Sequence, residues 1–368
     1  EVKERTMGAC CSGLKPHEYD NIAQKESVSI DGITLDVESE GFTKRAVAYV
    51  NPVSGSGRSL KAVEVMKPIF KEAGCELIVR ETEYASHMTT LANEEALDKV
   101  NYLISIGGDG SIHELVNGFI SRPDYEEVKG KVALGVVPAG TGNTFAYDLS
   151  ILSIEDSAKA IVSNKAREID AIELTFPESP SEKPVYGCNI VGWSFSASVL
   201  TRYEAMRCLA FDCLRSNLYA IAGYCEVIAN ASYSCKIEFP ESTNIDPEVR
   251  KRLAEHTEVS YVQAQNTVYM GDKLPGAPSA VLDDGLLDLV VIKHLSRLDF
   301  VLVGEDLKGG TLHKVPEKGV DYIQTSEFTL TPTRKEQAGE NSVNVDGNLV
   351  GLSPMKVRCI NKAILVSC

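Results

Sequence analysis

Between residues 44 and 166, short apolar runs alternate with stretches in which apolar positions recur at helical spacing. The run at 46–50 ends in a glycine turn, after which Leu60, Val63, Met66 and Phe70 follow at helical spacing. The same unit predicts further strands at residues 76–80, 102–106 and 133–137 and helices at residues 87–97 and 111–119. Because these strands are apolar without alternation, we expect a parallel sheet covered on both faces, which is a Rossmann-like α/β domain over 44–166.

After about residue 167 the pattern changes to β-branched alternation interrupted by Gly and Pro turns. The strands it predicts lie at residues 168–174, 186–191, 235–239, 259–266, 286–292, 327–331, 342–345 and 355–359. A helical interruption is expected over 200–229, and surface loops over 177–184 and 240–258. We interpret residues 167–368 as an antiparallel β-sandwich, whose C-terminal end is a candidate to return to the first domain.

Length and charge narrow the choice of partners. The 368 residues exceed what one hydrophobic core usually serves, so two domains are expected, preceded by a polar, weakly periodic extension at residues 1–43. The 37 basic and 52 acidic residues give a net charge of −15, which argues against a nucleic-acid partner and opposes anionic membranes. No apolar run approaches the roughly 20 residues of a membrane span. The ten cysteines lack metal-type spacing and indicate reduced thiols in a cytoplasmic protein.

Three of the predicted parallel strands end in glycine-rich loops, and such ends meet at one edge of a sheet. The first loop, residues 51–57, contains Ser54, Gly55, Ser56 and Gly57 before a helix. Its backbone could approach a phosphate group closely, or it could be a simple turn between a strand and a helix. It is not a Walker loop, because no Gly-Lys-Ser/Thr follows.

The second loop places a single carboxylate, Asp109, among Gly107, Gly108 and Gly110. A carboxylate there could bind Mg²⁺ or accept the proton of an attacking hydroxyl, which are two tasks of phosphoryl transfer. The alternative is that Asp109 only caps the helix that follows. The third loop, PAGTGN at residues 138–143, follows the next strand. The coincidence of three loops favours a phosphate-binding site over three unrelated turns.

The motif GGDGSIHELVNG resembles the catalytic domain of diacylglycerol kinases and sphingosine kinases, together with the preceding NPVSGSG and TEYASHM and the following VPAGTGN. The segments VGWSFSASV, DDGLLDL and NVDG extend this resemblance, which runs from about residue 44 to 368. It implies a kinase that uses ATP and Mg²⁺, with the nucleotide between an α/β domain and a lipid-binding β-sandwich.

Position by position, the resemblance implies roles for individual residues. Asp109 corresponds to the general base, and Asp346, the second candidate catalytic residue, to the aspartate of a late Asp-Gly-Glu motif near the active centre. Asp283 or Asp284 with Asp288 match a turn that holds a structural metal in some relatives, and Asp109 is a further candidate metal ligand. The implied nucleotide-binding residues are Asn51, Ser54, Gly55, Ser56, Gly57, Thr82, Gly107, Gly108, Gly110, Glu114, Gly140, Thr141, Asn143 and Arg207.

Two departures from the family pattern bear on the substrate. Asn348 stands in place of the Asp-Gly-Glu glutamate, and Ser198 in place of the aspartate that sphingosine kinases place opposite the sphingosine amine. A cationic amine would then lack its counter-charge, so diacylglycerol is favoured over sphingosine or ceramide. Phe195, Ser198 and Leu209 are the candidate substrate contacts, and the apolar positions around 206–224 either line a lipid tunnel, face a membrane or form plain core. NAD kinase and an inactive nucleotide or lipid sensor are the other hypotheses.

Near the N-terminus, the segment MGACCS matches the pattern for N-myristoylation. Gly8 would carry the myristoyl group, and Cys10 and Cys11 are candidates for palmitoylation. This requires Gly8 to become the terminal residue, although six residues precede Met7. Two acyl chains would give stable peripheral attachment of an acidic protein to a membrane that holds its substrate.

Overall fold

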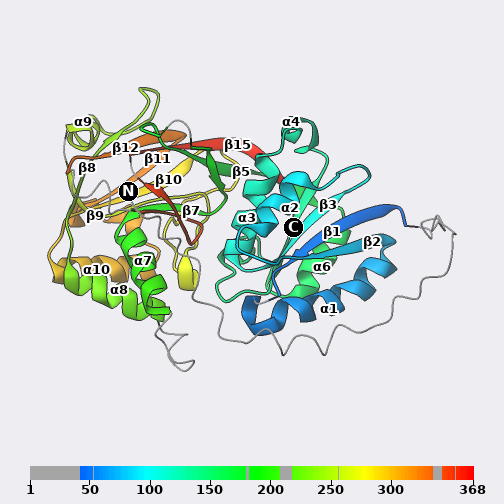
Figure 1. Cartoon of the computed structure of the whole chain (residues 1–368). Coiled ribbons are helices and arrows are strands. Elements are labelled where there is room, and N and C mark those ends of the chain that lie inside the picture. The colour runs from blue at the N-terminus through cyan, green and yellow to red at the C-terminus, as the bar shows by residue number, and fades with distance from the viewer. Residues whose placement is uncertain are drawn as a thin grey trace, which may run out of the picture.

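The computed structural model describes residues 42–52, 54–179, 182–207, 218–255, 257–334, 342–352 and 354–368. They form two halves that lie side by side, an N-terminal α/β half and a C-terminal half rich in β-strands (Figure 1). No helix in these ranges is long and apolar enough to cross a membrane.

The N-terminal half is built on four parallel strands. Their spatial order is β4 (Ala133–Pro138), β3 (Tyr102–Gly107), β1 (Lys44–Val50) and β2 (Cys75–Glu81). Ala46 and Ala48 pack in a cluster with Met66 of α1, whereas Val47 and Tyr49 pack in a second cluster with residues of α3. Successive residues of β1 are therefore buried on opposite faces, which confirms the predicted sheet covered on both sides.

Helices cover both faces of this sheet. On one face lie α1 (Arg58–Glu72) and α6 (Ile154–Val162), and on the other α2 (His87–Glu94) and α3 (Asp109–Ile120). The short helices η2 (Ser54–Gly57), α4 (Tyr125–Val128) and α5 (Thr144–Asp148) lie in the connections. Helix α3 begins two residues earlier than the pattern predicts, so Asp109 is its first residue.

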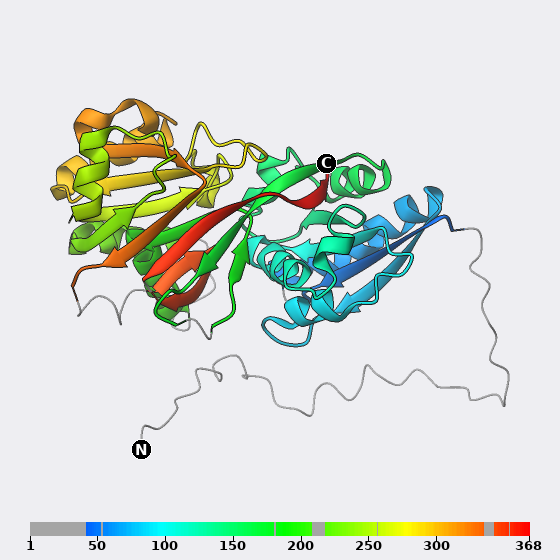
Figure 2. The same cartoon turned by 90° about the horizontal axis from the view of Figure 1, so that it is seen from above.

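Two long strands join the halves. Strand β15 (Met355–Ser367) pairs antiparallel with β5 (Ala166–Thr175) over most of its length, and near its end Leu365 pairs with Ala133 of β4 in parallel register. Figure 2 shows β15 running from the C-terminal half onto the helices and strands of the N-terminal half. The end of the chain therefore adds a strand to the N-terminal sheet.

The C-terminal half is sandwich-like, with a core around Trp193, Leu289, Phe328 and Val357. Its other strands are β6 (Val185–Gly187), β7 (Ile190–Ser194), β8 (Tyr233–Glu238), β9 (Thr257–Gln265), β10 (Leu287–Lys293), β11 (Val320–Thr325), β12 (Glu327–Pro332), β13 (Ser342–Val345) and β14 (Asn348–Leu352). Their pairing is antiparallel, as predicted, although β11 and β14 are strands that the pattern did not predict.

The helices of this half differ from the expectation. The interruption predicted over 200–229 corresponds to α7 (Phe195–Arg207), which begins five residues earlier, and to α8 (Leu218–Ala229), and the loop predicted over 240–258 contains α9 (Pro247–Glu255). The pattern did not predict α10 (Arg297–Lys308) or the short η4 (Gly271–Lys273), η5 (Leu312–Lys314) and η6 (Pro316–Lys318). The α9 error arises because that helix buries only Leu253, so its apolar periodicity is weak.

Candidate active site

The three glycine loops meet at the carboxyl ends of β1, β3 and β4, which are neighbours in the sheet. A Cβ atom on Gly55 would lie 2.0 Å from the carbonyl oxygen of Ala139, and one on Gly140 would lie 2.3 Å from the Cα of Gly108. Only glycine fits at these two positions, because any side chain would separate the loops. The three loops therefore lie together at one edge of the sheet.

Side chains from the first and third loops hold this arrangement. Arg58 donates from Nη2 to the carbonyl of Gly140 at 2.8 Å and from Nε to the carbonyl of Gly55 at 3.1 Å. Asn143, at φ +54°, accepts from the backbone N–H of Gly140 at 2.9 Å and donates to the carbonyl of Gly140 at 3.0 Å. The Asn143 side chain thus holds the third loop by bonding to the backbone of Gly140. Arg58 connects the first and third loops, a contact that the motifs did not reveal.

Helix α1 offers its N-terminus to this site. Gly57, at φ +84°, caps the helix, and the first turn carries no acidic residue. The positive end of the helix dipole is therefore not neutralised by its own first turn, which suits a phosphate group. Ser54 and Gly55 belong to the η2 turn just before this helix, while the side chain of Ser56 lies outside the described part of the chain.

The side chain of Asp109, a residue of the second loop, lies against the third loop. Its Oδ1 accepts from the backbone N–H of Phe145 at 3.1 Å, and a Cβ atom on Gly142 would lie 2.7 Å from its Oδ2. Burial raises the pKa of Asp109 above its ordinary value, against the lowering effect of hydrogen bonds from Phe145 and Thr144. The N-cap of α3 is Gly108, and Asp109 is the first residue of the helix. A partly buried carboxylate of raised pKa is suited to accept a proton.

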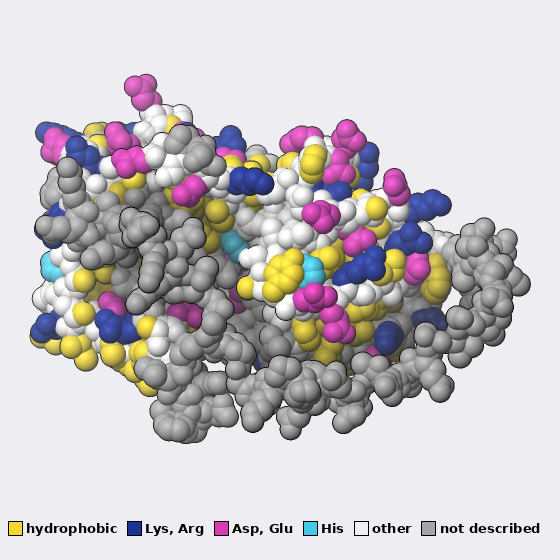
Figure 3. All heavy atoms as spheres, in the orientation of Figure 1, with side chains coloured by type: hydrophobic (Ala, Val, Ile, Leu, Met, Phe, Trp, Pro, Cys, Tyr) yellow, Lys and Arg dark blue, Asp and Glu magenta, His cyan; other side chains and the backbone are white. Residues whose placement is uncertain are grey.

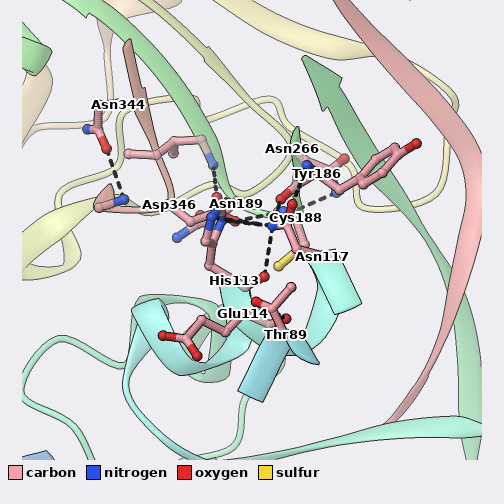
Figure 4. A network of polar contacts seen from close by, with 12 residues as sticks. Thr89, His113, Glu114, Asn117, Tyr186, Cys188, Asn189, Asn266, Asn344 and Asp346 are labelled. Atoms are coloured by element: carbon pink, nitrogen blue, oxygen red, sulfur yellow. Dashed lines mark hydrogen bonds and ion pairs between the residues drawn. The ribbon is translucent and has the colours of Figure 1, made fainter. Parts of the chain in front are cut away.

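Asp346 occupies the turn between β13 and β14 and is almost fully buried (Figure 4). Its carboxylate accepts backbone N–H groups from Cys188 at 3.0 Å, Asn189 at 3.0 Å and Ile190 at 2.8 Å. The ring Nδ1 of His113 lies 3.4 Å from Oδ2. Both carboxylate oxygens are thus engaged by the backbone, which is the geometry of an anchor for the β6–β7 turn.

Two polar side chains of the N-terminal half make contacts that their motif positions did not reveal. Asn117 of α3 accepts from the backbone N–H of Tyr186 at 2.8 Å and donates to the carbonyl of the same residue, which ties α3 to β6 (Figure 4). Asp148, at the end of α5, accepts from the backbone N–H groups of Val268 at 3.0 Å and Tyr269 at 3.2 Å. Burial raises the pKa of Asp148 to about 6. Both contacts join the halves beside the glycine loops.

Glu114 lies on α3, just after the second loop, and Thr82 lies beside the end of β1, just before the first loop; both have local partners. The Glu114 carboxylate accepts from the backbone N–H groups of Ser86 and Met88, each at 3.1 Å, and so holds the N-terminus of α2. Thr82 donates its backbone N–H to the carbonyl of Val50 at the end of β1. Thr82 is therefore at the edge of the loop cluster, whereas Glu114 supports a neighbouring helix.

The predicted structural metal site is not assembled. Asp284 accepts from the backbone N–H of Leu286 within its own turn, and Asp288 is buried in β10, where burial raises its pKa to about 6. Across the residues that the structure describes, no group of three or more His, Cys, Asp or Glu side chains could hold a metal ion.

A magnesium ion brought by a nucleotide needs fewer protein ligands, because phosphates and water complete its coordination. Asp109 can supply one such ligand. Asn348 lies beside the second loop, since a Cβ atom on Gly110 would be 3.8 Å from its amide atoms, and its buried Nδ2 has no hydrogen-bond partner. The site therefore fits a metal held by Asp109 and phosphates, with Asn348 adding an amide where the family pattern has a carboxylate.

An apolar cavity of about 320 Å³ lies between α7, α8, α10 and strands β9 and β10. Phe195, one of the predicted substrate contacts, lines it. Ser198 does not, because its hydroxyl faces that of Tyr233 at 2.5 Å. Leu209, the side chain of Arg207, and the N-terminal Gly8, Cys10 and Cys11 lie outside the described residues.

Hydrogen bonds connect this cavity to the turn that holds Asp346. Ser196 lines the cavity, donates to Gln263 at 3.1 Å and accepts from Asn344 at 3.2 Å. Asn344 in turn accepts from the backbone N–H of Gly347, the residue after Asp346. Ser196 in the cavity lining and the β13–β14 turn thus belong to one hydrogen-bond network.

Family models match both halves of the chain. The diacylglycerol kinase catalytic domain matches residues 45–174, and the YegS C-terminal NAD kinase beta sandwich-like domain matches residues 203–368. Sphingosine kinase 1 of Arabidopsis thaliana is 24% identical, over 98% of this chain and 81% of its own length. A diacylglycerol kinase of Bacillus subtilis is 28% identical, over 84% of this chain and 92% of its own length.

The fold has a counterpart of known structure. A crystal structure of a diacylglycerol kinase from Bacillus anthracis matches with a TM-score of 0.65 at 19% identity, covering 89% of this chain and 97% of that chain. The two successive domain matches and the kinase relatives show that the chain belongs to the superfamily of diacylglycerol and sphingosine kinases and is a lipid kinase.

Proposed function

We propose that this chain transfers the γ-phosphoryl group of ATP to the primary hydroxyl of a neutral membrane lipid, with diacylglycerol as the favoured acceptor and Asp109 as the proton acceptor. The observation that carries the proposal is the position of Asp109. It is the carboxylate enclosed by the second and third glycine loops, where burial raises its pKa. The apolar cavity of the adjoining half supplies a place for a lipid chain.

The glycine loops and the N-terminus of α1 bind and orient the nucleotide phosphates, since the backbone approaches closely and the helix dipole favours an anion. The lipid hydroxyl oxygen forms a bond to the γ-phosphorus as the bond from that phosphorus to the β–γ bridging oxygen breaks. ADP leaves, and the hydroxyl proton passes to the Asp109 carboxylate. Mg²⁺, when bound, neutralises charge on the phosphates.

Asp346 has a positioning role in this proposal. Its two oxygens accept three backbone N–H groups, so they are not available to a lipid hydroxyl without loss of those bonds. It instead holds the β6–β7 turn against the N-terminal half, where Asn117 of α3 binds Tyr186.

The preference for a neutral lipid is supported by the cavity. Among its described lining residues there is no Asp or Glu, and the charged one is Lys308. The ammonium group of a sphingoid base lies next to the hydroxyl that is phosphorylated, and the described lining supplies no carboxylate to pair with it, which is unfavourable where that group is partly buried. The relatives include both diacylglycerol and sphingosine kinases, so sphingosine remains the second candidate.

A radiolabelled ATP assay with a panel of acceptors in detergent micelles tests the proposal. We expect phosphorylation of diacylglycerol to exceed that of sphingosine and ceramide, and Asp109→Asn to lower kcat by about two orders of magnitude with nucleotide affinity retained. ATP binding without turnover on any acceptor would instead support a sensor. Full activity of Asp109→Asn would remove it as the base.

We also propose that the MGACCS segment is acylated, because an acyl anchor would offset the repulsion between a chain of net charge −15 and an anionic membrane. In eukaryotic cells, a chain starting at Met7 should carry a myristoyl group on Gly8 by intact mass, and Gly8→Ala should lower the share of the protein in the membrane fraction. The double change Cys10→Ser and Cys11→Ser should leave weak binding. An unmodified terminus on a soluble chain would contradict the proposal.

A further inference from the structure

Helices α8 and α10 expose large apolar side chains next to each other on the lower edge of the C-terminal half (Figure 3). Tyr224 and Ile228 of α8 are 70% and 68% exposed, and Leu298, Val301 and Leu302 of α10 are 79%, 50% and 59% exposed. We call these five residues the α8–α10 face. They make up five of the twelve large apolar side chains that are exposed in the described part of the chain.

The outward surface of α8 is unusual for an acidic chain. Its one charged residue, Glu226, is buried and forms an ion pair with Arg202 of α7 at 2.5 Å. The exposed side of α8 therefore carries no charge, whereas solvent-facing helix surfaces are ordinarily polar. On α10, exposed Glu305 is paired with Lys308 at 2.7 Å, and exposed Arg297 and Asp299 carry opposite charges, so that helix has little net charge.

The apolar cavity lies next to this face and bears on what the face contacts. Tyr224 and Val301, which belong to the face, also line the cavity, as do Gly223 and Gly304 on the same two helices. The cavity thus opens between the exposed surfaces of α8 and α10. A protein partner on this face would close the cavity, whereas a bilayer would let a water-insoluble ligand enter without crossing water.

We propose that the α8–α10 face is the surface by which this kinase docks onto a lipid bilayer, inserting these side chains among the acyl chains at the cavity entrance. The inference rests on the proposed lipid-kinase function. Both segments are helical, so their backbone polar groups are satisfied within the element and can approach hydrocarbon. Docking is expected to depend on apolar contact, since a net charge of −15 opposes anionic lipid.

The test uses the full chain in a Gly8→Ala background, which cannot be N-myristoylated, and phosphatidylcholine vesicles that contain no acceptor lipid. We compare the parent, Tyr224→Gln with Ile228→Gln, and Leu298→Gln with Leu302→Gln by flotation. Each pair should raise the vesicle Kd at least about tenfold, because removing two inserted apolar side chains costs that much. Raising salt to about 0.5 M, where screening acts within roughly 4 Å, should leave parent binding unchanged.

The matched control is Leu60→Gln with Leu152→Gln, which removes two exposed leucines from the N-terminal half. It should bind vesicles like the parent. The Leu298→Gln with Leu302→Gln variant and the control change no residue that lines the cavity, so both should keep parental turnover on a short-chain acceptor dispersed without a bilayer. If the parent binds vesicles but phosphorylates none of the acceptors, the proposed activity is overturned and the docking surface stands.

Three results would overturn the docking surface. They are absence of vesicle binding by the parent, unchanged binding of both helix variants, and equal loss in the Leu60 and Leu152 control. A parental dimer that dissociates in the helix variants by analytical ultracentrifugation would assign the face to a second copy of the chain and would also overturn it.

Discussion

The two motif aspartates should separate cleanly when each is changed to asparagine. Asp346 lies at φ +51°, a backbone conformation that asparagine tolerates well, so Asp346→Asn does not strain the turn. The amide oxygen can replace only one carboxylate oxygen. It can keep the N–H groups of Asn189 and Ile190, which both bind Oδ1, while the amide NH₂ group would face the N–H of Cys188.

The cost follows from these contacts. One buried N–H loses its acceptor and meets another donor, which costs about 1–3 kcal/mol. The two retained hydrogen bonds lose the carboxylate charge and weaken by roughly 1 kcal/mol each. We therefore expect Asp346→Asn to lower the free energy of unfolding by about 3–5 kcal/mol, a large part of the 5–15 kcal/mol typical of a domain.

Denaturant unfolding followed by the fluorescence of Trp193, the chain's one tryptophan, measures this loss, and a kinase assay below the transition measures turnover of the folded fraction. Asp109→Asn should show the opposite profile, with near-parental stability and turnover lowered about a hundredfold. Asp284→Asn, in an exposed turn, is the control. Parental stability of Asp346→Asn with turnover lowered as far as in Asp109→Asn would refute the anchoring role and make Asp346 a catalytic carboxylate.

Three further changes test other contacts. Burial raises the pKa of Asp148 from 3.8 to about 6, so its ionisation costs stability as pH rises through about 6. The stability of the parent relative to Asp148→Asn should fall by about 1–2 kcal/mol between pH 4.5 and 7.5, and a constant difference in melting curves would disprove this. Gly140→Ala, with a Cβ 2.3 Å from Gly108, should weaken ATP binding at least about tenfold by calorimetry, whereas Gly130→Ala, with open space around its Cβ, should not. Ser198→Asp should leave the ratio of sphingosine to diacylglycerol turnover within about threefold, because Ser198 faces Tyr233; a tenfold rise would place the lipid head group there.

The sequence predicts the four parallel strands and helices α1, α2 and α3 of the N-terminal half because the strands are buried on both faces and these helices have one apolar side, whereas α6 was not predicted. Strands β1, β3 and β4 read as continuous apolar runs, and the loops after them had to meet. Helix α10 escaped prediction for a physical reason. Its outward side chains include Leu298, Val301 and Leu302, so the contrast between an apolar and a polar face that identifies a helix is missing.

The site residues were predicted by position and less well by contact. The motifs brought Gly55, Gly140 and Asp109 together, as the structure has them. They gave no sign of Arg58 as a bridge between loops, because its acceptors are backbone carbonyls of residues brought close only by folding. Ser198 was expected to face a lipid, yet the turn of α7 directs it to Tyr233 and directs Phe195 to the cavity.

A common feature explains which contacts escaped. Asp346, Asn117 and Asp148 all bind backbone groups, those of residues 188–190, of Tyr186, and of Val268 and Tyr269. Every residue except proline offers a backbone N–H, so the residue type of the partner does not reveal the contact in the sequence. Such contacts specify only one of their two residues. A change on the other side, such as Tyr186→Phe, keeps the bond to Asn117, and the joint between the halves can therefore persist while its partners vary.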